Sequence, residues 1–413
     1  MVVVGGGFGG LNAARALAGQ PVRVTLLDRR NHHLFQPLLY QVATAALNAS
    51  DIAAPLRSVL RRARNITVLL AEVERVDLAA RRLQLDRGEL AYDALILATG
   101  ASDSYFGHED WEVFAPGLKT LEDALEIRRR VLLAYESAER EQDGAEQKAL
   151  LTFVVVGGGP TGVELGARVL AAFPESLSGR AQAALERLGV EVRSRATVTR
   201  VTADAVWLGG RADPRPHGAV GSRRGRRPAC RTLGVELDRS GRVPVEPDLS
   251  LPGHPEVFVI GDMSLCRDDK GAPLPGLAPV ATQQGSRAAD NVLRHLRGRP
   301  TRPFRYRDRG TMATIGRAKA VAVIGGVKLS GLVAWLAWLF VHIMFLIGFR
   351  NRFLVLFEWA WAYVTWQRGA RLITGPIGAL PPVKAIAPDG QPALPEVARI
   401  VSLDPEAREQ RAG

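Results

Sequence analysis

Short apolar runs in the first part of the chain alternate with segments of helical composition. Residues 2–4 read VVV and lead into a glycine-rich turn, and an Ala/Leu-rich stretch then leads to VRVTLLD at 22–28. Apolar runs of this length, ended by turn residues or an acid, are typical of strands buried in a parallel sheet. The pattern therefore predicts a strand–helix–strand unit at the N-terminus.

Two further apolar runs predict strands that end in polar turns. Residues 93–100 read DALILATG, and residues 254–262 read HPEVFVIGD, after a hairpin-like stretch that begins at residue 241. A carboxylate at the carboxyl end of a strand in an α/β sheet is well placed to meet a ligand, although alone it could equally cap a helix. Asp262 is therefore a candidate ligand-binding residue.

The opening pattern begins again at residue 154 but is not completed there. Residues 154–166 read VVVGGGPTGVELG, and a Phe-Pro turn follows within about a dozen residues of the glycines. The next clear strand is LGVEV at 188–192, after a predicted helix at 178–188. A dinucleotide-binding βαβ unit needs about 30 residues and an acid about 20 residues after the glycines. Most of the crossover helix and the whole second strand are therefore missing at this place.

The most apolar part of the chain lies near its C-terminal end. Residues 331–349 read GLVAWLAWLFVHIMFLIGF, and five of the seven tryptophans fall between residues 335 and 366. The stretch is long enough to cross a bilayer, whereas tryptophan at this density is typical of a membrane interface. Three alternatives are a spanning helix, helices lying in the interface, and a buried helix of a soluble dimer. After residue 375 the composition predicts a flexible tail.

Composition and net charge do not indicate a nucleic acid partner, a disulfide framework or a metal site. The chain has 413 residues and a net charge of +12, and about half of that excess lies in the aperiodic basic segment 211–231. That segment has no aromatic residues for base stacking, so no nucleic acid partner is expected. Two distant cysteines indicate a reduced compartment, with no disulfide framework and no metal site.

The N-terminal glycines form a complete dinucleotide fingerprint. Gly5, Gly7 and Gly10 are spaced as G-x-G-x-x-G between the first predicted strand and helix, and the second predicted strand ends at Asp28. The glycines allow the tight turn and close approach of the backbone to a pyrophosphate, which faces the helix N-terminus. The acid can accept hydrogen bonds from an adenosine ribose.

The order of these motifs resembles a known family. Two glycine fingerprints, ATG at 98–100 and VFVIGD at 257–262 resemble flavoproteins with two dinucleotide-binding domains. Within these, PLLYQVAT, APVATQQG, GTMATIGRAKAV and the aromatic C-terminal region resemble the type II NADH dehydrogenases. The resemblance implies an α/β fold: a Rossmann-like FAD domain, an inserted, here shortened, Rossmann-like NAD(P)H domain and a membrane-associated helical region. The FAD domain would comprise residues 1–120 and 241–310, the NAD(P)H domain residues 121–240, and the membrane-associated region residues 311–375. Residues 376–413 would be a flexible tail.

The family implies specific roles for residues of this chain. NADH would reduce FAD, and the flavin would reduce a membrane quinone without proton pumping. Gln283 and Gln284 would lie where the quinone approaches, and Glu164 would lie near the nicotinamide; the Gln pair alone could equally be a polar helix start. The FAD ligands would be Gly5, Gly7, Gly10, Asp28, Thr99, Gly100, Gly261 and Asp262, and the NADH ligands Gly157, Gly159 and Gly162. The family also implies docking to the cytoplasmic face of the cell membrane through residues 331–371, and leaves a homodimer open.

The sequence departs from the family pattern in two places, and these departures leave other functions open. The shortened second fingerprint and the basic segment 211–231 both fall in the predicted NAD(P)H domain, and Glu175 is the one acid at the right distance to replace the ribose ligand. An alternative function is therefore a membrane-docked FAD protein with impaired or lost NADH oxidation. Cys266 also leaves open a cysteine-using flavoprotein such as a sulfide:quinone oxidoreductase, although a lone buried thiol explains it as well.

Overall fold

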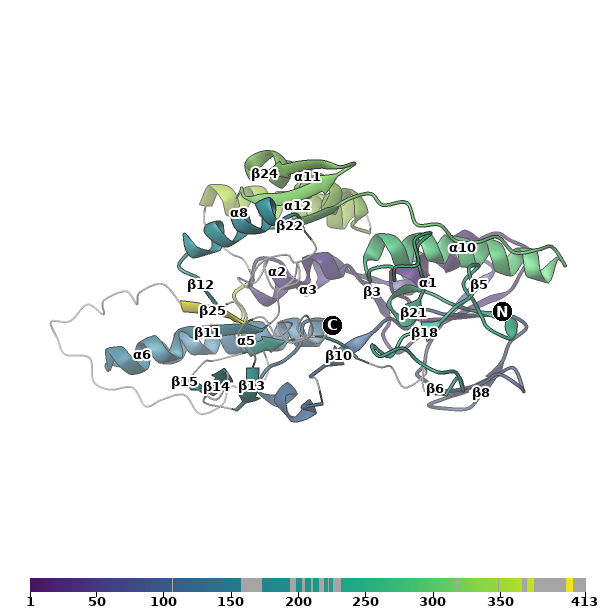
Figure 1. Ribbon diagram of the computed structural model, residues 1–413, viewed down its shortest axis with the longest axis horizontal. Helices are drawn as coiled ribbons and strands as arrows, with labels where there is room; N and C mark the ends of the chain where they lie inside the picture. Colours follow the sequence, from purple (N-terminus) through teal and green to yellow (C-terminus); the bar gives the residue numbers. More distant parts are fainter. Residues whose placement is uncertain are drawn as a thin grey trace. The chain divides into compact units, whose positions relative to one another are not determined.

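The chain forms two compact units, and Figure 1 labels many of their elements. Unit 1 contains Met1–Leu34, Ala53–Ser104 and Arg224–Arg309, and unit 2 contains Phe35–Ile52, Tyr105–Arg223 and Gly310–Gly413. The division differs from the predicted domains, because residues 35–52, 105–120 and 311–375 all group with unit 2. The computed structural model describes residues 1–105, 107–156, 173–193, 198–202, 205–208, 211–214, 219–221, 223–225, 232–316, 318–347, 349–365, 370–374 and 399–403.

Unit 1 is built on a six-stranded sheet with the order β19-β20-β9-β1-β2-β5. All neighbouring strands are parallel except β19 and β20. The predicted strand–helix–strand unit is present as β1, α1 and β2. The elements of the sheet and its helix are β1 (Val2–Val4), α1 (Phe8–Leu17), β2 (Val24–Asp28), β5 (Ile66–Leu70), β9 (Leu95–Leu97), β19 (Ser250–Leu251) and β20 (His254–Val259).

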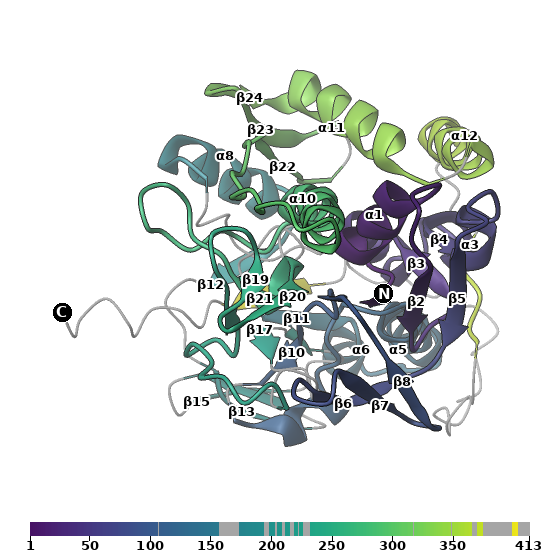
Figure 2. The ribbon, with the colours of Figure 1, turned by 90° about the vertical axis from the view of Figure 1, so that its right-hand side faces the viewer.

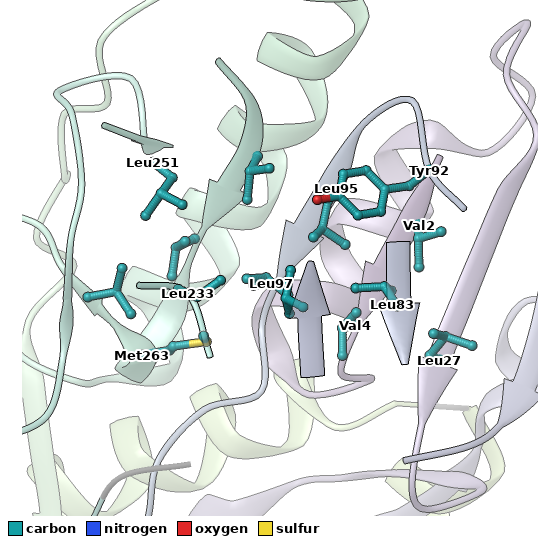
Figure 3. Packing of buried hydrophobic residues seen from close by; sticks show 14 residues of the cluster. Val2, Val4, Leu27, Leu83, Tyr92, Leu95, Leu97, Leu233, Leu251 and Met263 are labelled. Carbon is teal, nitrogen blue, oxygen red and sulfur yellow. The ribbon is translucent and has the colours of Figure 1, made fainter. Parts of the chain in front are cut away.

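Both faces of this sheet are covered. Helix α10 (Ala278–Leu296) packs along α1, and Figure 2 shows the two helices side by side. The antiparallel strands β6 (Val73–Asp77), β7 (Arg82–Leu85) and β8 (Glu89–Ala91) contribute Val76 and Leu83 to a buried apolar cluster with sheet residues such as Val2 and Leu97, shown in Figure 3. Burial on both faces explains why β1 and β9 are continuously apolar.

The smaller elements of unit 1 connect these layers. They are β3 (His32–Leu34), β4 (Ala53–Pro55), α4 (Leu56–Val59), β10 (Ser102–Ser104), β18 (Val243–Pro244), the 3₁₀ turn η3 (Gly261–Met263) and β21 (Ser264–Leu265). Strand β10 pairs with β17 (Arg223–Gly225).

Unit 2 contains a four-stranded sheet with the order β12-β25-β11-β16, in which every neighbouring pair is parallel. Its strands are β11 (Thr152–Val156), β12 (Glu191–Arg193), β16 (Ala219–Gly221) and β25 (Arg399–Leu403). The sequence predicted a flexible tail after residue 375, and residues 399–403 differ from that prediction because they form a strand between β11 and β12.

A second, antiparallel sheet of unit 2 carries the C-terminal helices. Strands β22 (Thr311–Thr314), β23 (Ala320–Ile324) and β24 (Val327–Ser330) pack against α8 (Glu175–Glu186) and α11 (Gly331–Phe345), and α12 (Phe349–Thr365) follows. The apolar stretch 331–349 is therefore not one continuous helix. Among the residues that the structure describes, no helix has both the length and the apolar character needed to cross a bilayer.

The remaining elements of unit 2 include a helical layer in which α2 packs on α5. Thr120 and Asp123 form a reciprocal capping box at the start of α5. These elements are η1 (Gln36–Leu38), α2 (Leu39–Ala43), α3 (Ala49–Ile52), η2 (Glu109–Val113), α5 (Leu121–Ala138), α6 (Gly144–Leu150), β13 (Val198–Val201), β14 (Ala205–Leu208) and β15 (Arg211–Pro214).

Candidate functional site

The turn between β1 and α1 has room only for glycine at two of its positions. Gly5 has a φ of +101°, and a Cβ there would overlap the Ala98 carbonyl. A Cβ on Gly10 would overlap the Gly5 carbonyl, so α1 could not approach β1 this closely. Gly7, which precedes α1, has open space instead and no side chain caps the helix. The N-terminus of α1 thus has no side-chain cap, which makes it a candidate binding site for a phosphate group.

Asp28 is held against this turn from the end of β2. Its Oδ2 accepts a hydrogen bond from the Gly6 N–H at 2.5 Å, and its Oδ1 accepts one from the Arg30 N–H at 2.7 Å. Each carboxylate oxygen has a second lone pair, so the group can still accept from a ribose hydroxyl. The structure therefore brings together the predicted glycines and the predicted acid.

His33 is a neighbour of this turn that sequence reasoning missed. Its ring is buried, its Nδ1 lies 2.9 Å from the Gly6 carbonyl oxygen, and it meets the Phe8 ring edge to face. Burial lowers the pKa of His33, which favours a neutral ring that donates to Gly6. Only the tertiary structure relates His33 to the glycine turn, so no local signal could have found it.

The turn after β20 is fixed by a buried amide. Gly261 has a φ of +73°, and its N–H donates to Gln284 Oε1 at 2.6 Å. Gln284 is 1% exposed, and its Nε2 lies 3.4 Å from Ser264 Oγ. Asp262, the predicted ribityl ligand, is the second residue of η3. The amide thus positions the turn that carries Asp262.

Thr99 and Gly100 lie at the same edge of the sheet. They follow β9, Gly100 has a φ of +68°, and Thr99 Oγ1 lies 3.2 Å from Met263 Sδ. Strands β1, β2, β9 and β20 are parallel neighbours, so their carboxyl ends meet at one edge. Ligands bind at this edge in open α/β sheets. Every predicted FAD residue of unit 1 lies at a strand end, in a turn or at a helix start along this edge.

Gln283 has a different environment from Gln284. Its Oε1 accepts from the Arg307 N–H and its Nε2 donates to the Arg307 carbonyl, both at 3.0 Å. This reciprocal pair ties α10 to the segment that follows it and is partly open to solvent. The two predicted glutamines therefore both have protein partners.

Several other predicted site residues lie outside the described residues. These are Glu164, Gly157, Gly159 and Gly162. Strand β11, which ends at Val156, immediately precedes them. No group of three or more potential metal ligands occurs in the part of the chain that the structure describes. Cys266 is a buried free thiol whose pKa is raised by burial, so it is a poor nucleophile.

The C-terminal helices contain a buried polar cluster that the sequence did not reveal. Trp359 Nε1 donates to Gln41 Oε1 at 2.7 Å, and Gln41 Nε2 donates to the Tyr40 hydroxyl at 2.9 Å. His342 stacks on Trp338, and its Nδ1 lies 2.8 Å from the Trp338 carbonyl oxygen. Burial lowers the pKa of His342 to about 4, so its ring is neutral.

The opposite faces of these helices are apolar and exposed. On α11, Ala334, Trp338 and His342 are buried, whereas Leu336 and Phe340 between them are exposed. The exposed side chains, which we call the apolar face of unit 2, are between 45% and 66% accessible: Leu332, Val333, Leu336, Phe340, Met344, Phe345, Phe353, Leu356, Phe357 and Trp361.

Comparison with known proteins places this arrangement among flavoprotein oxidoreductases. A model of the family described as "Pyridine nucleotide-disulphide oxidoreductase" matches residues 1–285, and one described as "NDH2 C-terminal domain" matches residues 309–365. The type II NADH:quinone oxidoreductase NdhA of Mycobacterium tuberculosis is 40% identical over 91% of this chain and 89% of its own. The demethylphylloquinone reductase NdbB of Synechocystis is 31% identical over 91% of this chain and 96% of its own.

Solved structures share the fold at low identity. NDH2 from Plasmodium falciparum in complex with NADH aligns with a TM-score of 0.81 at 18% identity, over 90% of this chain and 99% of that one. The sulfide:quinone oxidoreductase of Aquifex aeolicus aligns with a TM-score of 0.67 at 19% identity, over 94% of this chain and 99% of that one. These two likenesses concern the fold alone.

Proposed function

The chain belongs to the family of type II NADH:quinone oxidoreductases, and from that premise we propose which of its residues bind FAD, NADH and quinone. It is an FAD-dependent enzyme that oxidises NADH and reduces quinone without pumping protons. The flavin supplies the hydride acceptance and the electron transfer. The protein supplies binding, orientation and electrostatics.

The FAD proposal rests on the convergence of four strand ends in unit 1. The open N-terminus of α1 would bind the pyrophosphate, and the Asp28 carboxylate would accept from the adenosine ribose. Asp262 would bind the ribityl chain from the turn that Gln284 holds. This convergence is the observation that carries the proposal, because it brings a helix N-terminus without a side-chain cap and two carboxyl-bearing residues to one edge.

The NADH and quinone residues are proposed from the family. Glu164 would lie near the nicotinamide, with Gly157, Gly159 and Gly162 at the NADH pyrophosphate. Gln283 and Gln284 would stand where quinone is reduced. In addition, their hydrogen bonds to Arg307 and Gly261 support a positioning role, since each amide ties another backbone segment to the N-terminal half of α10.

Members of this family are peripheral membrane enzymes. For this chain we propose docking to one leaflet, on the cytoplasmic face, through the apolar face of unit 2. Quinones are lipid-soluble, and the face presents aromatic and aliphatic side chains that water solvates poorly. A homodimer is a further proposal, tested by the mass of the detergent-solubilised protein.

The decisive experiment is an anaerobic titration of the flavin-loaded protein with NADH, followed by absorbance. We expect NADH to bleach the flavin stoichiometrically and added quinone to restore the oxidised spectrum. Dithionite is the control reductant. Bleaching by dithionite alone would instead support the alternative of an FAD protein without NADH oxidation, which none of the comparisons favours.

A further inference from the structure

Polar side chains hold helix α12 against two shorter helices of unit 2. Trp359 Nε1 donates to Gln41 Oε1 of α2 at 2.7 Å, and Asn351 Nδ2 lies 3.5 Å from the Ser50 carbonyl oxygen of α3. Val355 lies between these contacts on the same side of α12 and is fully buried. Hydrogen bonds at two points along this side therefore fix α12 to α2 and α3.

A pair of carboxyl groups lies on the same side of α12. Glu358 of α12 is half-buried, and Asp51 of α3 is 5% exposed. The two carboxyl groups, which we call the carboxyl pair, are in hydrogen-bond contact with each other. Asn48 donates to both, from its backbone N–H to Asp51 Oδ2 at 2.7 Å and from its Nδ2 to Glu358 Oε1 at 3.4 Å.

Contact between these two groups requires a proton. Ionised carboxylates only accept hydrogen bonds, so one carboxyl group can bond to the other only when one of them is protonated. Glu358 Oε2 is buried and accepts from no donor among the residues that the structure describes. Asn48 is exposed, so water can exchange protons with the pair. The geometry thus fits two carboxyl groups with one proton between them.

The surroundings provide no compensating positive charge. Helix α12 packs on α3 and α11, as Figure 2 shows, and His342, the titratable residue of α11, is neutral. Arg352 of α12 donates its Nε to a backbone carbonyl oxygen at 2.8 Å. The Tyr40 hydroxyl of α2 accepts from Gln41. Among the described side chains, no cation forms an ion pair with the carboxyl pair, so a second negative charge there would be unfavourable.

We propose that Asp51 and Glu358 share one proton, and that this proton holds α12 against α3. When the proton passes to water, two carboxylates face each other in a partly buried place and repel. The hydrogen bonds of Asn351 and Trp359 along the same side of α12 then break more often. The carboxyl pair is thus a pH-sensitive switch of the α12 contact.

The direction of the switch follows from the environment of Glu358. Burial, followed by the charge of Asp51, raises the pKa of Glu358 from its ordinary value of 4.5 to about 7. A raised pKa in the closed form means that the bound proton stabilises this form. That stabilisation is complete below pH 4.5 and is lost as the pH rises through 7. Helix α12 is therefore held more firmly in mildly acidic than in mildly alkaline solution.

The switch acts on a helix that carries part of the apolar face of unit 2. Phe353, Phe357 and Trp361 are exposed on the outer side of α12. A loosened α12 presents these side chains in more orientations than a fixed one. The change takes place within unit 2 and requires neither FAD, NADH nor quinone.

The test is hydrogen exchange of the full-length, flavin-loaded protein, measured as protection factors, which are corrected for the pH dependence of free amides. We expect the protection of residues 351–361 to fall about fivefold from about pH 6 to about pH 8, after allowance for solvent screening. In Glu358→Gln and in Asp51→Asn this protection should be equal at the two pH values. Glu136→Gln, at an exposed position of α5, is the control and should keep the wild-type response.

A second measurement follows the proton itself. The infrared pH-difference spectrum of the wild type should lose a protonated-carboxyl band across the same pH range, and Glu358→Gln should lack this change. Protection of α12 that does not depend on pH in the wild type, or that falls equally in Glu358→Gln, would overturn the proposal. Neither readout uses NADH, so an inactive protein with an intact pH response would contradict the proposed function alone.

Discussion

At the scale of residues, the site depends on buried hydrogen bonds more than on the identity of exposed groups. Gln284 is the clearest case, because its buried amide accepts from Gly261 and so holds the turn that carries Asp262. A buried backbone N–H that loses its acceptor carries the full cost of its desolvation. The neighbouring Gln283 makes similar bonds in a partly solvated place, where water can replace them.

We expect Gln284→Met to lower the free energy of unfolding of the FAD-loaded protein by about 1–3 kcal/mol and to weaken FAD binding. Methionine keeps a similar volume but offers no comparable acceptor to Gly261. Gln283→Met is the matched control and should cost much less. Urea denaturation and FAD titration measure both quantities. Equal losses in the two variants would contradict the positioning role of Gln284.

Glu358 on α12 gives a prediction about pH. Burial, followed by the charge of Asp51, raises the pKa of Glu358 to about 7 from its ordinary value of 4.5. The folded protein therefore holds a proton that the unfolded chain releases at lower pH. The resulting stabilisation is complete below pH 4.5 and is lost as the pH rises through 7.

Glu358→Gln should therefore raise the free energy of unfolding by about 1 kcal/mol near pH 8, after allowance for solvent screening, and leave it unchanged near pH 4. Urea denaturation at both pH values measures this difference. Glu136→Gln, a change at an exposed position of helix α5, is the control and should not alter the pH dependence. A variant no more stable than the wild type at pH 8 would show that the carboxylate is not destabilising there.

At the scale of elements, helix α11 is apolar on both sides, for two different reasons. One side covers the sheet of β22, β23 and β24, and the other belongs to the apolar face of unit 2. A helix packed only within a soluble protein would carry polar residues on its outer side. The outer side of α11 therefore supports the proposed contact with a membrane.

Phe340→Ser should reduce binding to vesicles of phosphatidylcholine and phosphatidylglycerol by about tenfold, because it removes a large side chain from the proposed contact. Val113→Ser is the matched control, since Val113 is as exposed as Phe340 but lies on η2. Co-sedimentation with vesicles measures the binding. If both variants bind like the wild type, the apolar face does not contact lipid.

At the scale of the whole molecule, local patterns predicted unit 1 much better than unit 2. The β1–α1–β2 unit is contiguous in the sequence, so Val2–Val4, the glycines and Asp28 could be interpreted together. The partners of the Gln283, Gln284 and His33 side chains could not be predicted from the sequence. They are Arg307, Gly261 and Gly6, which come close to these side chains only in the folded chain. The placement of Glu164 stays a prediction.

Strand β25 shows most clearly what the sequence could not reveal. RIVSL is short, begins with a charged residue and has a serine near its end, so it lacks the continuous apolar character of β1. Its partners lie more than two hundred residues earlier in the chain. Pairing at such separation leaves no periodic signal in the sequence.

The late position of β25 has a consequence for how the protein is made. The sheet of unit 1 has all its strands once residue 259 has been synthesised, whereas the sheet of unit 2 waits for residue 403. During translation β11 and β12 therefore leave the ribosome without the strand that joins them, with edges open to mispairing. A nascent chain that stops early would carry a finished first sheet and an unfinished second one, and it would be a substrate for chaperones or proteases.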